Sequence, residues 1–219
     1  MCNGPLGKYL SYVARINNQS QIVIQEFQNG KSEVISNHKT GVSSFYWSPD
    51  ETKIAFIARD EKPQKSESET FIKAFEVKPH GYLDFQSYLS SHLFILNINN
   101  KKTKRLTEGG WTVNGGVSWS TDGRTLDFSR KENPLPSEWH KNKIMLLDLE
   151  SGSLTGYSDR DGFEYNPSYS PNGKHFVYSR IIDQNPAGMR DLFFQTGKNK
   201  PVNLTRWLEK YFVIELTIF

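Results

Sequence analysis

Two serines lie in sequences that come close to the nucleophile elbow of serine hydrolases. The elbow has the form G-x-S-x-G and exposes a serine that attacks a carbonyl carbon. The chain contains Gly41-Val42-Ser43-Ser44-Phe45 and Gly116-Val117-Ser118-Trp119-Ser120, and each lacks the final glycine. Both serines lead into an aromatic residue and a polar turn, a context typical of a β-strand. We therefore predict that this chain contains no catalytic residue.

Metal and cofactor chemistry has little support in the sequence. The segment Asp159-Arg160-Asp161-Gly162 begins like a calcium loop, but the later ligands and the closing glutamate are absent, which favours a turn. The histidines show neither H-x-x-x-H nor Cys/His spacing, so a zinc site is not indicated. We predict no metal site and no cofactor. The histidines are His38, His80, His92, His140 and His175.

A repeated motif surrounds these residues and must position them. An aromatic residue leads into a Ser-(Pro/Thr)-(Asp/Asn)-(Gly/Glu) turn, and a short hydrophobic strand follows. Proline, asparagine, aspartate and glycine each favour a tight turn at such positions. Glu51 in place of glycine and Thr121 in place of proline predict turns that are strained or differently shaped. The three clear copies and a weaker first copy are residues 47–56, 119–128, 169–178 and 4–13.

Each motif already spans two β segments, and it is followed by a third segment, a polar turn and a short fourth segment. Four β segments per unit are the content of one propeller blade. Side chains alternate along a strand, so Ile54 and Phe56 should point to one face and Ala55 and Ile57 to the other. The fold class that we predict is all-β, with blades of four antiparallel strands and an incomplete, open propeller of about four blades. The later segments are residues 20–25 and 34–36, 92–98 and 105–107, 143–149 and 154–155, and 191–194 and 202–205.

The blades are expected to occupy residues 1–206, with an insertion at about 59–91. Its charged, serine-rich run at 61–69 cannot bury a core and predicts a solvated loop. Residues 207–219 are expected to be the truncated start of a further blade or an irregular tail. The apolar stretch 211–219 is far shorter than the roughly 20 residues that a membrane-spanning helix needs.

Composition favours a soluble, cytoplasmic protein. Lysine and arginine number 27 against 24 aspartate and glutamate residues, and this net charge of +3 is scattered, so we predict no nucleic-acid partner and no membrane. The single Cys2 excludes an intramolecular disulfide. No apolar segment typical of a signal peptide is visible. The glycan acceptor patterns at Asn18 and Asn203 carry no weight without secretion.

Several segments together resemble the WD-like repeat of a known family. They are Trp47-Ser48-Pro49-Asp50, Lys53-Ile54-Ala55-Phe56, Leu93-Phe94-Ile95-Leu96 and Arg105-Leu106-Thr107. Over roughly residues 4–206 the chain resembles the amino-terminal propeller of the prolyl oligopeptidase family of serine peptidases, in its acylaminoacyl-peptidase and dipeptidyl-peptidase-like branches. The repeat is also similar to that of the Tol-associated periplasmic propeller protein. Uneven blade lengths, the long insertion and Glu132-Asn133-Pro134 favour the peptidases.

The resemblance implies a non-catalytic role. In that family the chemistry belongs to a carboxy-terminal α/β-hydrolase domain, which we do not find in this chain. The chain would then be a propeller portion that gates the access of short peptides to a hydrolase domain, its expected partner. The paired glutamates that anchor the substrate amine in the dipeptidyl branch are not recognisable, because Glu67 and Glu69 lie in the polar run. The alternative is a stand-alone propeller that binds a protein partner, similar to the Tol-associated protein.

Overall fold

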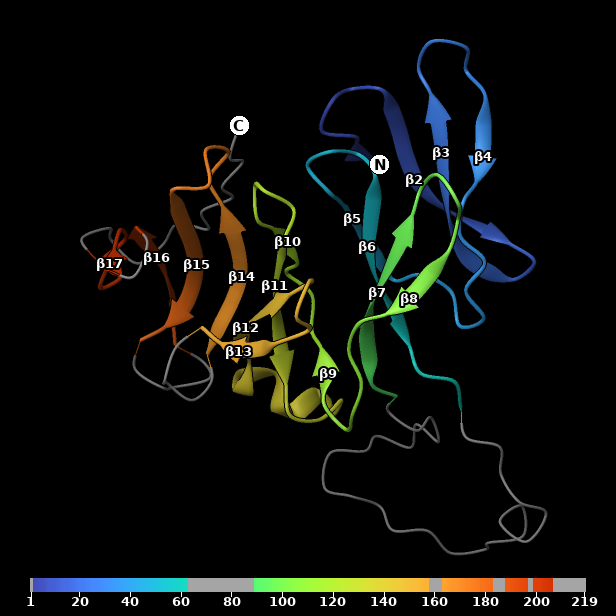
Figure 1. The fold of residues 1–219 in the computed structure, drawn as a ribbon. Helices are drawn as coiled ribbons and strands as arrows, with labels where there is room; N and C mark the ends of the chain where they lie inside the picture. The colour runs from blue at the N-terminus through green and yellow to red at the C-terminus, as the bar shows by residue number, and fades with distance from the viewer. Residues whose placement is uncertain (1, 63–88, 158–162, 183–187, 197–198, 207–219) are drawn as a thin grey trace, which may run out of the picture.

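Four antiparallel sheets follow one another along the chain, and each forms one blade (Figure 1). The computed structural model describes residues 2–62, 89–157, 163–182, 188–196 and 199–206. Blade 1 contains β1 (Cys2–Asn3), β2 (Tyr9–Ile16), β3 (Gln19–Glu26) and β4 (Ser32–Val34). Blade 2 contains β5 (Ser44–Trp47), β6 (Lys53–Arg59), β7 (Ser91–Asn97) and β8 (Thr103–Arg105).

The other two blades repeat the same strand order. Blade 3 contains β10 (Ser118–Trp119), β11 (Thr125–Lys131), β12 (Lys143–Asp148) and β13 (Leu154–Gly156). Blade 4 contains β14 (Glu164–Tyr169), β15 (His175–Ile181), β16 (Arg190–Thr196) and β17 (Val202–Asn203). Two features were not foreseen: β9 (Thr112–Val113), which pairs with β11, and the 3₁₀ helix η2 (Pro136–Lys141). The described residues contain no α-helix, and none of their helices could cross a membrane.

The repeated turns share one hydrogen-bond pattern in blades 2, 3 and 4. In each, the serine hydroxyl donates to the following Asp or Asn side chain and accepts the backbone N–H of the next strand's first residue. Glu51 adopts φ +52°, the left-handed conformation that glycine adopts at Gly123 and Gly173. The turn with Glu51 is therefore strained. The Glu51 turn and the Thr121 turn have the same shape as the turn of blade 4, so the alternative of a different shape is wrong. The donor and acceptor pairs are Ser48–Asp50, Ser120–Asp122 and Ser170–Asn172 at 2.6, 2.7 and 2.7 Å.

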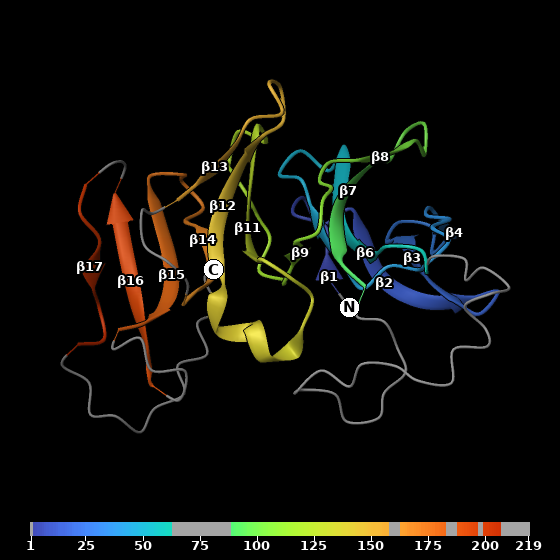
Figure 2. The ribbon, with the colours of Figure 1, turned by 90° about the horizontal axis from the view of Figure 1, so that it is seen from below.

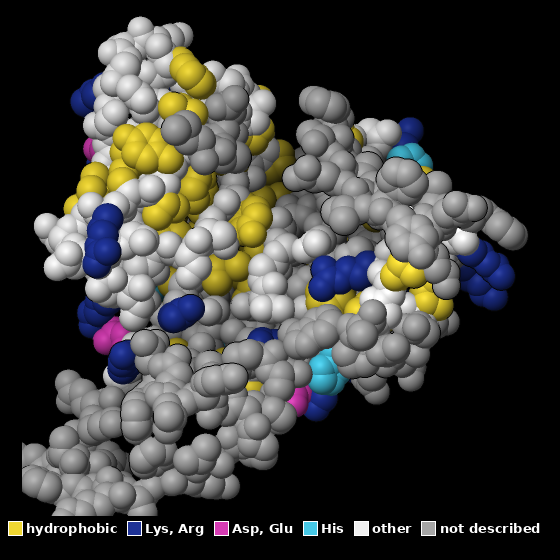
Figure 3. All heavy atoms as spheres, turned by 180° about the vertical axis from the view of Figure 1, so that it is seen from behind, with side chains coloured by type: hydrophobic (Ala, Val, Ile, Leu, Met, Phe, Trp, Pro, Cys, Tyr) yellow, Lys and Arg dark blue, Asp and Glu magenta, His cyan; other side chains and the backbone are white. Residues whose placement is uncertain are grey.

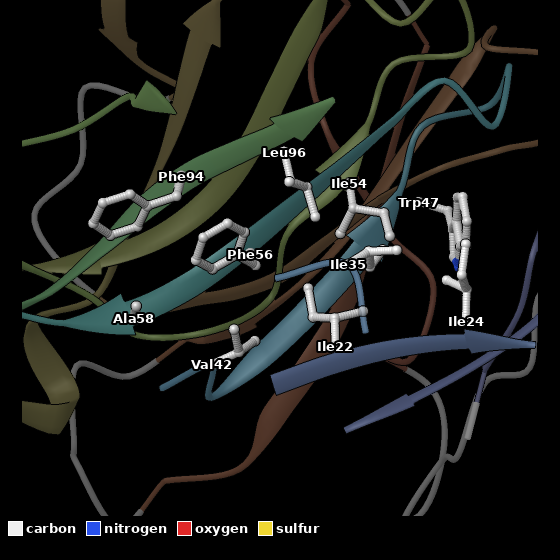
Figure 4. Packing of buried hydrophobic residues seen from close by; sticks show 10 residues of the cluster. All are labelled: Ile22, Ile24, Ile35, Val42, Trp47, Ile54, Phe56, Ala58, Phe94 and Leu96. Atoms are coloured by element: carbon white, nitrogen blue, oxygen red, sulfur yellow. The ribbon is translucent and has the colours of Figure 1, made fainter. Parts of the chain in front are cut away.

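Each of the two inner blades packs one face against its predecessor and the other against its successor. On β6, Ile54, Phe56 and Ala58 join a buried cluster with Ile22 of blade 1 and Val42 of the linker between the two blades (Figure 4). Ala55 and Ile57 of the same strand join a second cluster with residues of blade 3. The expected alternation is therefore confirmed. A third cluster, around Ile144, Phe176, Tyr178 and Phe193, joins blades 3 and 4.

The described blades form an open row, with blade 1 at one end and blade 4 at the other (Figure 2). Strand β6 ends at Arg59 and β7 begins at Ser91, so the expected insertion lies between them. Residues 63–88 of that insertion lie outside the described residues, as do Asp159–Gly162 and residues 207–219. The observed architecture agrees with the prediction of an open, all-β propeller with blades of four antiparallel strands.

Candidate functional site

The three repeat aromatics hold neighbouring blades together. Trp47, Trp119 and Tyr169 each end the first strand of their blade. The indole N–H of Trp47 donates to Ser11 Oγ of blade 1 at 2.8 Å, and that of Trp119 donates to the carbonyl oxygen of Tyr46 in blade 2 at 3.1 Å. Both indoles are buried. These aromatics therefore occupy equivalent structural positions, and their polar groups are used between blades rather than offered to a ligand.

One position on the second strand faces the aromatic of the next blade. Counted from the turn, it is Ser11 in blade 1, Ala55 in blade 2 and Asp127 in blade 3, and all three residues are 0% exposed. Among the described residues, neither carboxylate oxygen of Asp127 has a hydrogen bond of good geometry, although the Tyr169 hydroxyl lies close enough to act on it. Burial raises the pKa of Asp127 to about 7, and the Tyr169 hydroxyl opposes this shift.

A second buried polar cluster surrounds His92. Its Nε2 lies 3.3 Å from the Asp60 carboxylate, and its Nδ1 lies 3.2 Å from Thr107 Oγ1. Arg105 Nη2 contacts the other oxygen of Asp60 at 2.9 Å. Burial lowers the pKa of His92, and the Asp60 carboxylate opposes this shift. Histidine and aspartate in contact resemble part of a catalytic triad, but the imidazole is 0% exposed and cannot meet a substrate.

The repeat explains the His92 cluster as a structural device. The hydroxyl of Thr107 accepts the backbone N–H of Leu93, the residue after His92, at 2.9 Å. Blades 1 and 4 contain the same bond, from Ile22 N to Ser36 Oγ at 2.8 Å and from Leu192 N to Thr205 Oγ1 at 2.9 Å. A hydroxyl after the fourth strand thus fixes the third strand in three blades. His92 belongs to this arrangement rather than to a reaction centre.

His38, His175 and Ser118 each contact neighbouring groups of the fold. His38 packs its ring against Phe94 and lies 3.1 Å from Thr40 Oγ1, and His175 lies 3.1 Å from Thr196 Oγ1. Ser118 accepts a hydrogen bond from the backbone N–H of Tyr169 at 3.2 Å. No cluster of three metal-ligating side chains occurs within the described part of the chain. His80, Glu67 and Glu69 lie outside it.

An open depression between blades 1 and 2 is a concave feature that could hold a ligand. Its volume is about 460 Å³. Its polar lining comes from the β2–β3 hairpin, the linker between the blades and the end of β6. The residues that matter for its chemistry are Arg15, Asn18, Gln19, Thr40, Ser43 and Arg59. Ser43, which begins as an elbow candidate in the sequence, is an exposed residue at its rim.

Sequence reasoning missed Asp127 and the depression for different reasons. The position of Asp127 could have been found by aligning the four repeats, because Ser11 and Ala55 precede it at the same distance from the turn. A carboxylate among Leu126 and Phe128 on a strand that is buried on both faces is itself a signal. The depression arises from the spacing between two blades, which no local pattern encodes.

The repeated blades show that the protein is a β-propeller. The amino-acid sequence shows the family to which this propeller belongs. Residues 7–181 match the family model described as the dipeptidyl peptidase IV N-terminal region, and the chain belongs to that family. No curated protein matches the sequence significantly.

Solved structures share the fold at low sequence identity. TolB from Acinetobacter baumannii is 18% identical with a TM-score of 0.59, over 92% of this chain and 42% of that one. Acylaminoacyl peptidase from Pyrococcus horikoshii is 11% identical with a TM-score of 0.65, over 94% of this chain and 31% of that one. The propeller domain of the Trilobed protease from Pyrococcus furiosus, whose title describes an open velcro topology, is 17% identical with a TM-score of 0.54, over 90% and 54%. The chain thus spans about half or less of these proteins.

Proposed function

We propose that this chain is the non-catalytic propeller portion of a prolyl-oligopeptidase-family serine peptidase and that it gates the access of short peptides to a hydrolase domain. The observation that carries the proposal is the family match over residues 7–181. The similarity of the fold to an acylaminoacyl peptidase agrees with it. His92 and Ser118 make structural contacts, which agrees with a partner domain as the source of the chemistry.

The proposal is tested by supplying the hydrolase domain. The reading frame downstream of this chain, in this frame or a shifted one, is searched for an α/β-hydrolase domain, which is then produced with and without the chain. We expect the pair to cleave short chromogenic peptides and to cleave an unfolded protein substrate much more slowly than the hydrolase domain alone. We expect slower cleavage of the long substrate because the propeller would exclude chains that are too bulky to reach the hydrolase site.

Two results would contradict the proposal. In one, the chain binds the hydrolase domain but leaves the ratio of long-substrate to short-substrate cleavage unchanged. In the other, no hydrolase domain is encoded nearby and the purified chain captures a single protein partner, which would favour a stand-alone binding module. The matched control for the binding step is an unrelated propeller of similar size, which should not change the ratio.

A further inference from the structure

The depression between blades 1 and 2 brings two arginines of equivalent repeat position to one opening. Arg15 lies six residues after Tyr9 on β2, and Arg59 lies six residues after Lys53 on β6. Both residues are exposed and both line the depression. The two arginines therefore stand at matching ends of equivalent strands in neighbouring blades, on the rim of one depression.

The other blade interfaces do not keep an accessible pair of cations at this place. The equivalent residue of blade 3 is Lys131, which is 7% exposed and donates from Nζ to the carbonyl oxygen of Leu135 at 2.9 Å. The equivalent residue of blade 4 is Ile181, which is 2% exposed. Within the described blades, the accessible pair of cations is therefore a feature of the first interface.

The floor of the depression is fixed by hydrogen bonds from the linker to both blades. Val42 N donates to the carbonyl oxygen of Ser20 at 2.7 Å, and Ser43 N donates to that of Ile57 at 2.8 Å. Thr40 Oγ1 donates to the carbonyl oxygen of Arg59 at 2.6 Å. Gly41 has φ +78°, and a Cβ there would lie 3.1 Å from Ser20 N, so the linker approaches β3 as only glycine allows. A preformed floor lowers the cost of ordering the site around a ligand.

The charged side chains that line the depression are all positive. No aspartate or glutamate is among its lining residues. The carboxylates that follow β6 are already engaged: Glu61 lies 3.3 Å from Lys39 and Asp60 lies 2.9 Å from Arg105. Among the described residues, neither Arg15 nor Arg59 has an ion pair. The hydroxyl and amide groups of the lining add donors that suit an anion.

We propose that this depression binds the oxyanion group of a small ligand, a carboxylate or a phosphate, between Arg15 and Arg59. A guanidinium offers two parallel N–H donors that match the oxygens of such a group, and a charge-assisted pair of this kind is stronger than a neutral hydrogen bond. The site lies entirely on the propeller, so the inference goes beyond the proposed function and does not depend on a hydrolase domain. The free carboxy-terminus of a short peptide and inorganic phosphate are the two sources to distinguish.

The experiment measures binding to the whole chain by calorimetric titration in a phosphate-free, low-salt buffer. The probes are N-acetyl-diglycine, its carboxy-terminal amide, and inorganic phosphate. We expect saturable binding of the acid, of phosphate or of both, and no binding of the amide. Arg15→Gln and Arg59→Gln should each weaken binding at least about tenfold, because each removes one charge-assisted contact. Binding should also weaken with added salt.

The controls separate the site from general charge effects. Arg124→Gln removes an exposed arginine in the turn of blade 3 and should leave binding unchanged. Arg15→Lys keeps the charge but loses the planar fork, and we expect an intermediate affinity. Circular dichroism of each variant checks the fold. Equal binding of the acid and the amide, or unchanged affinity in both glutamine variants, overturns the inference. Binding of one oxyanion alone supports it and identifies the source.

Discussion

At the residue scale, the repeat places three different side chains at one buried position of the second strand. Asp127 is the most polar of the three. Ser11 at the equivalent position accepts a hydrogen bond from Trp47, and Ala55 offers only a methyl group. Asp127 is buried next to Tyr169 without a well-formed hydrogen bond among the described residues. A carboxyl group in such surroundings is favoured in its protonated form.

The contact between blades 3 and 4 should therefore weaken as the pH rises. The unfolded carboxyl ionises near pH 4, whereas the folded carboxyl holds its proton until about pH 7. The folded state thus binds the extra proton, and its stability falls by up to about 1.4 kcal/mol per pH unit between those values. Above about pH 7 the loss is complete. Urea unfolding at fixed protein concentration across this pH range, for the wild type and for Asp127→Asn, measures the difference in slope.

The comparison has a matched control in Asp122→Asn. The Ser120 hydroxyl lowers the pKa of Asp122, so its contribution to stability changes below about pH 4 and not between pH 5 and 8. Tyr157 and Tyr169 near Asp127 have pKa values raised by burial and do not titrate in this range. Equal slopes for the wild type and Asp127→Asn would show that Asp127 is ionised in the folded protein at acidic pH.

A second prediction at this scale concerns Ser43 and Ser118. Neither lies in an elbow, and Ser118 Oγ accepts a backbone N–H rather than contacting a base in the described structure. The purified chain alone should not hydrolyse aminoacyl or acylaminoacyl chromogenic substrates. The assay follows release of the chromophore by the wild type, Ser43→Ala and Ser118→Ala. Turnover that is abolished in either variant would identify a nucleophile.

At the element scale, the turns of successive blades touch one another. Glu51 of the blade 2 turn accepts the backbone N–H of Leu6 in the blade 1 turn at 2.7 Å. A Cβ on Gly173 of the blade 4 turn would overlap the Thr121 hydroxyl of the blade 3 turn. The two positions that depart from the motif, Glu51 and Thr121, thus lie at contacts between turns. The departures have a tertiary cause that the single turn does not reveal.

Gly173→Ala should destabilise the protein more than Gly152→Ala. Both glycines have positive φ, +67° and +72°, so each alanine costs about 1 kcal/mol in backbone strain. A Cβ on Gly152 meets no atom within 4 Å, whereas one on Gly173 meets Thr121. We expect an additional loss of about 1–3 kcal/mol for Gly173→Ala, the usual cost of overpacking. Chemical unfolding at one pH measures both variants.

A double variant tests the cause of that difference. Thr121→Gly in the Gly173→Ala background should restore part of the lost stability, because it removes the overlapping side chain. The same substitution in the wild type should not stabilise. If the two glycine variants lose the same free energy, the turns of blades 3 and 4 do not press on one another.

Much of this level of structure could be predicted from the sequence. The turn motif, the alternation on β6 and the four-strand units follow from local patterns, because turn chemistry and a period of two depend on neighbouring residues only. Strand β9 has no such local signal, whereas helix η2 begins at Pro136 and carries Glu138 in its first turn, a local signal that our sequence analysis did not use. The Thr112 and Val113 backbone is ordered by pairing with Arg130 and Lys131, residues that come later in the chain.

At the scale of the whole molecule, the two ends of the row present faces that are buried elsewhere. Leu192 of blade 4 is partly exposed, whereas its equivalents Ile22, Leu93 and Ile144 are 0% exposed. Tyr12 of blade 1 is likewise partly exposed, although its equivalents in the other blades are buried. Figure 3 shows hydrophobic side chains gathered on the side of blade 1. Apolar sheet faces of this kind favour association.

We therefore expect the chain, produced alone, to self-associate. Light scattering after size-exclusion chromatography should give a mass above that of one chain, increasing with concentration. Leu192→Lys together with Val177→Lys should shift the distribution towards the monomer, because lysine on an apolar interface disfavours association. A matched control is Lys substitution at Thr103, an exposed residue of strand β8 in the inner blade 2. A monodisperse monomer with one cooperative unfolding transition would instead indicate a self-sufficient four-bladed protein.

The position shared by Ser11, Ala55 and Asp127 has a consequence for how such a molecule can evolve. Each interface pairs its own residue with its own aromatic: a hydroxyl with Trp47, a methyl group with Trp119, a carboxyl with Tyr169. A gene duplication that placed a copy of blade 2 after blade 3 would set the Trp47 indole against the Asp127 carboxyl. Blades with the same fold are thus not interchangeable, because each carries a residue that suits the aromatic of the next blade. These residue pairs, rather than the shared fold, constrain the order of the blades along the gene.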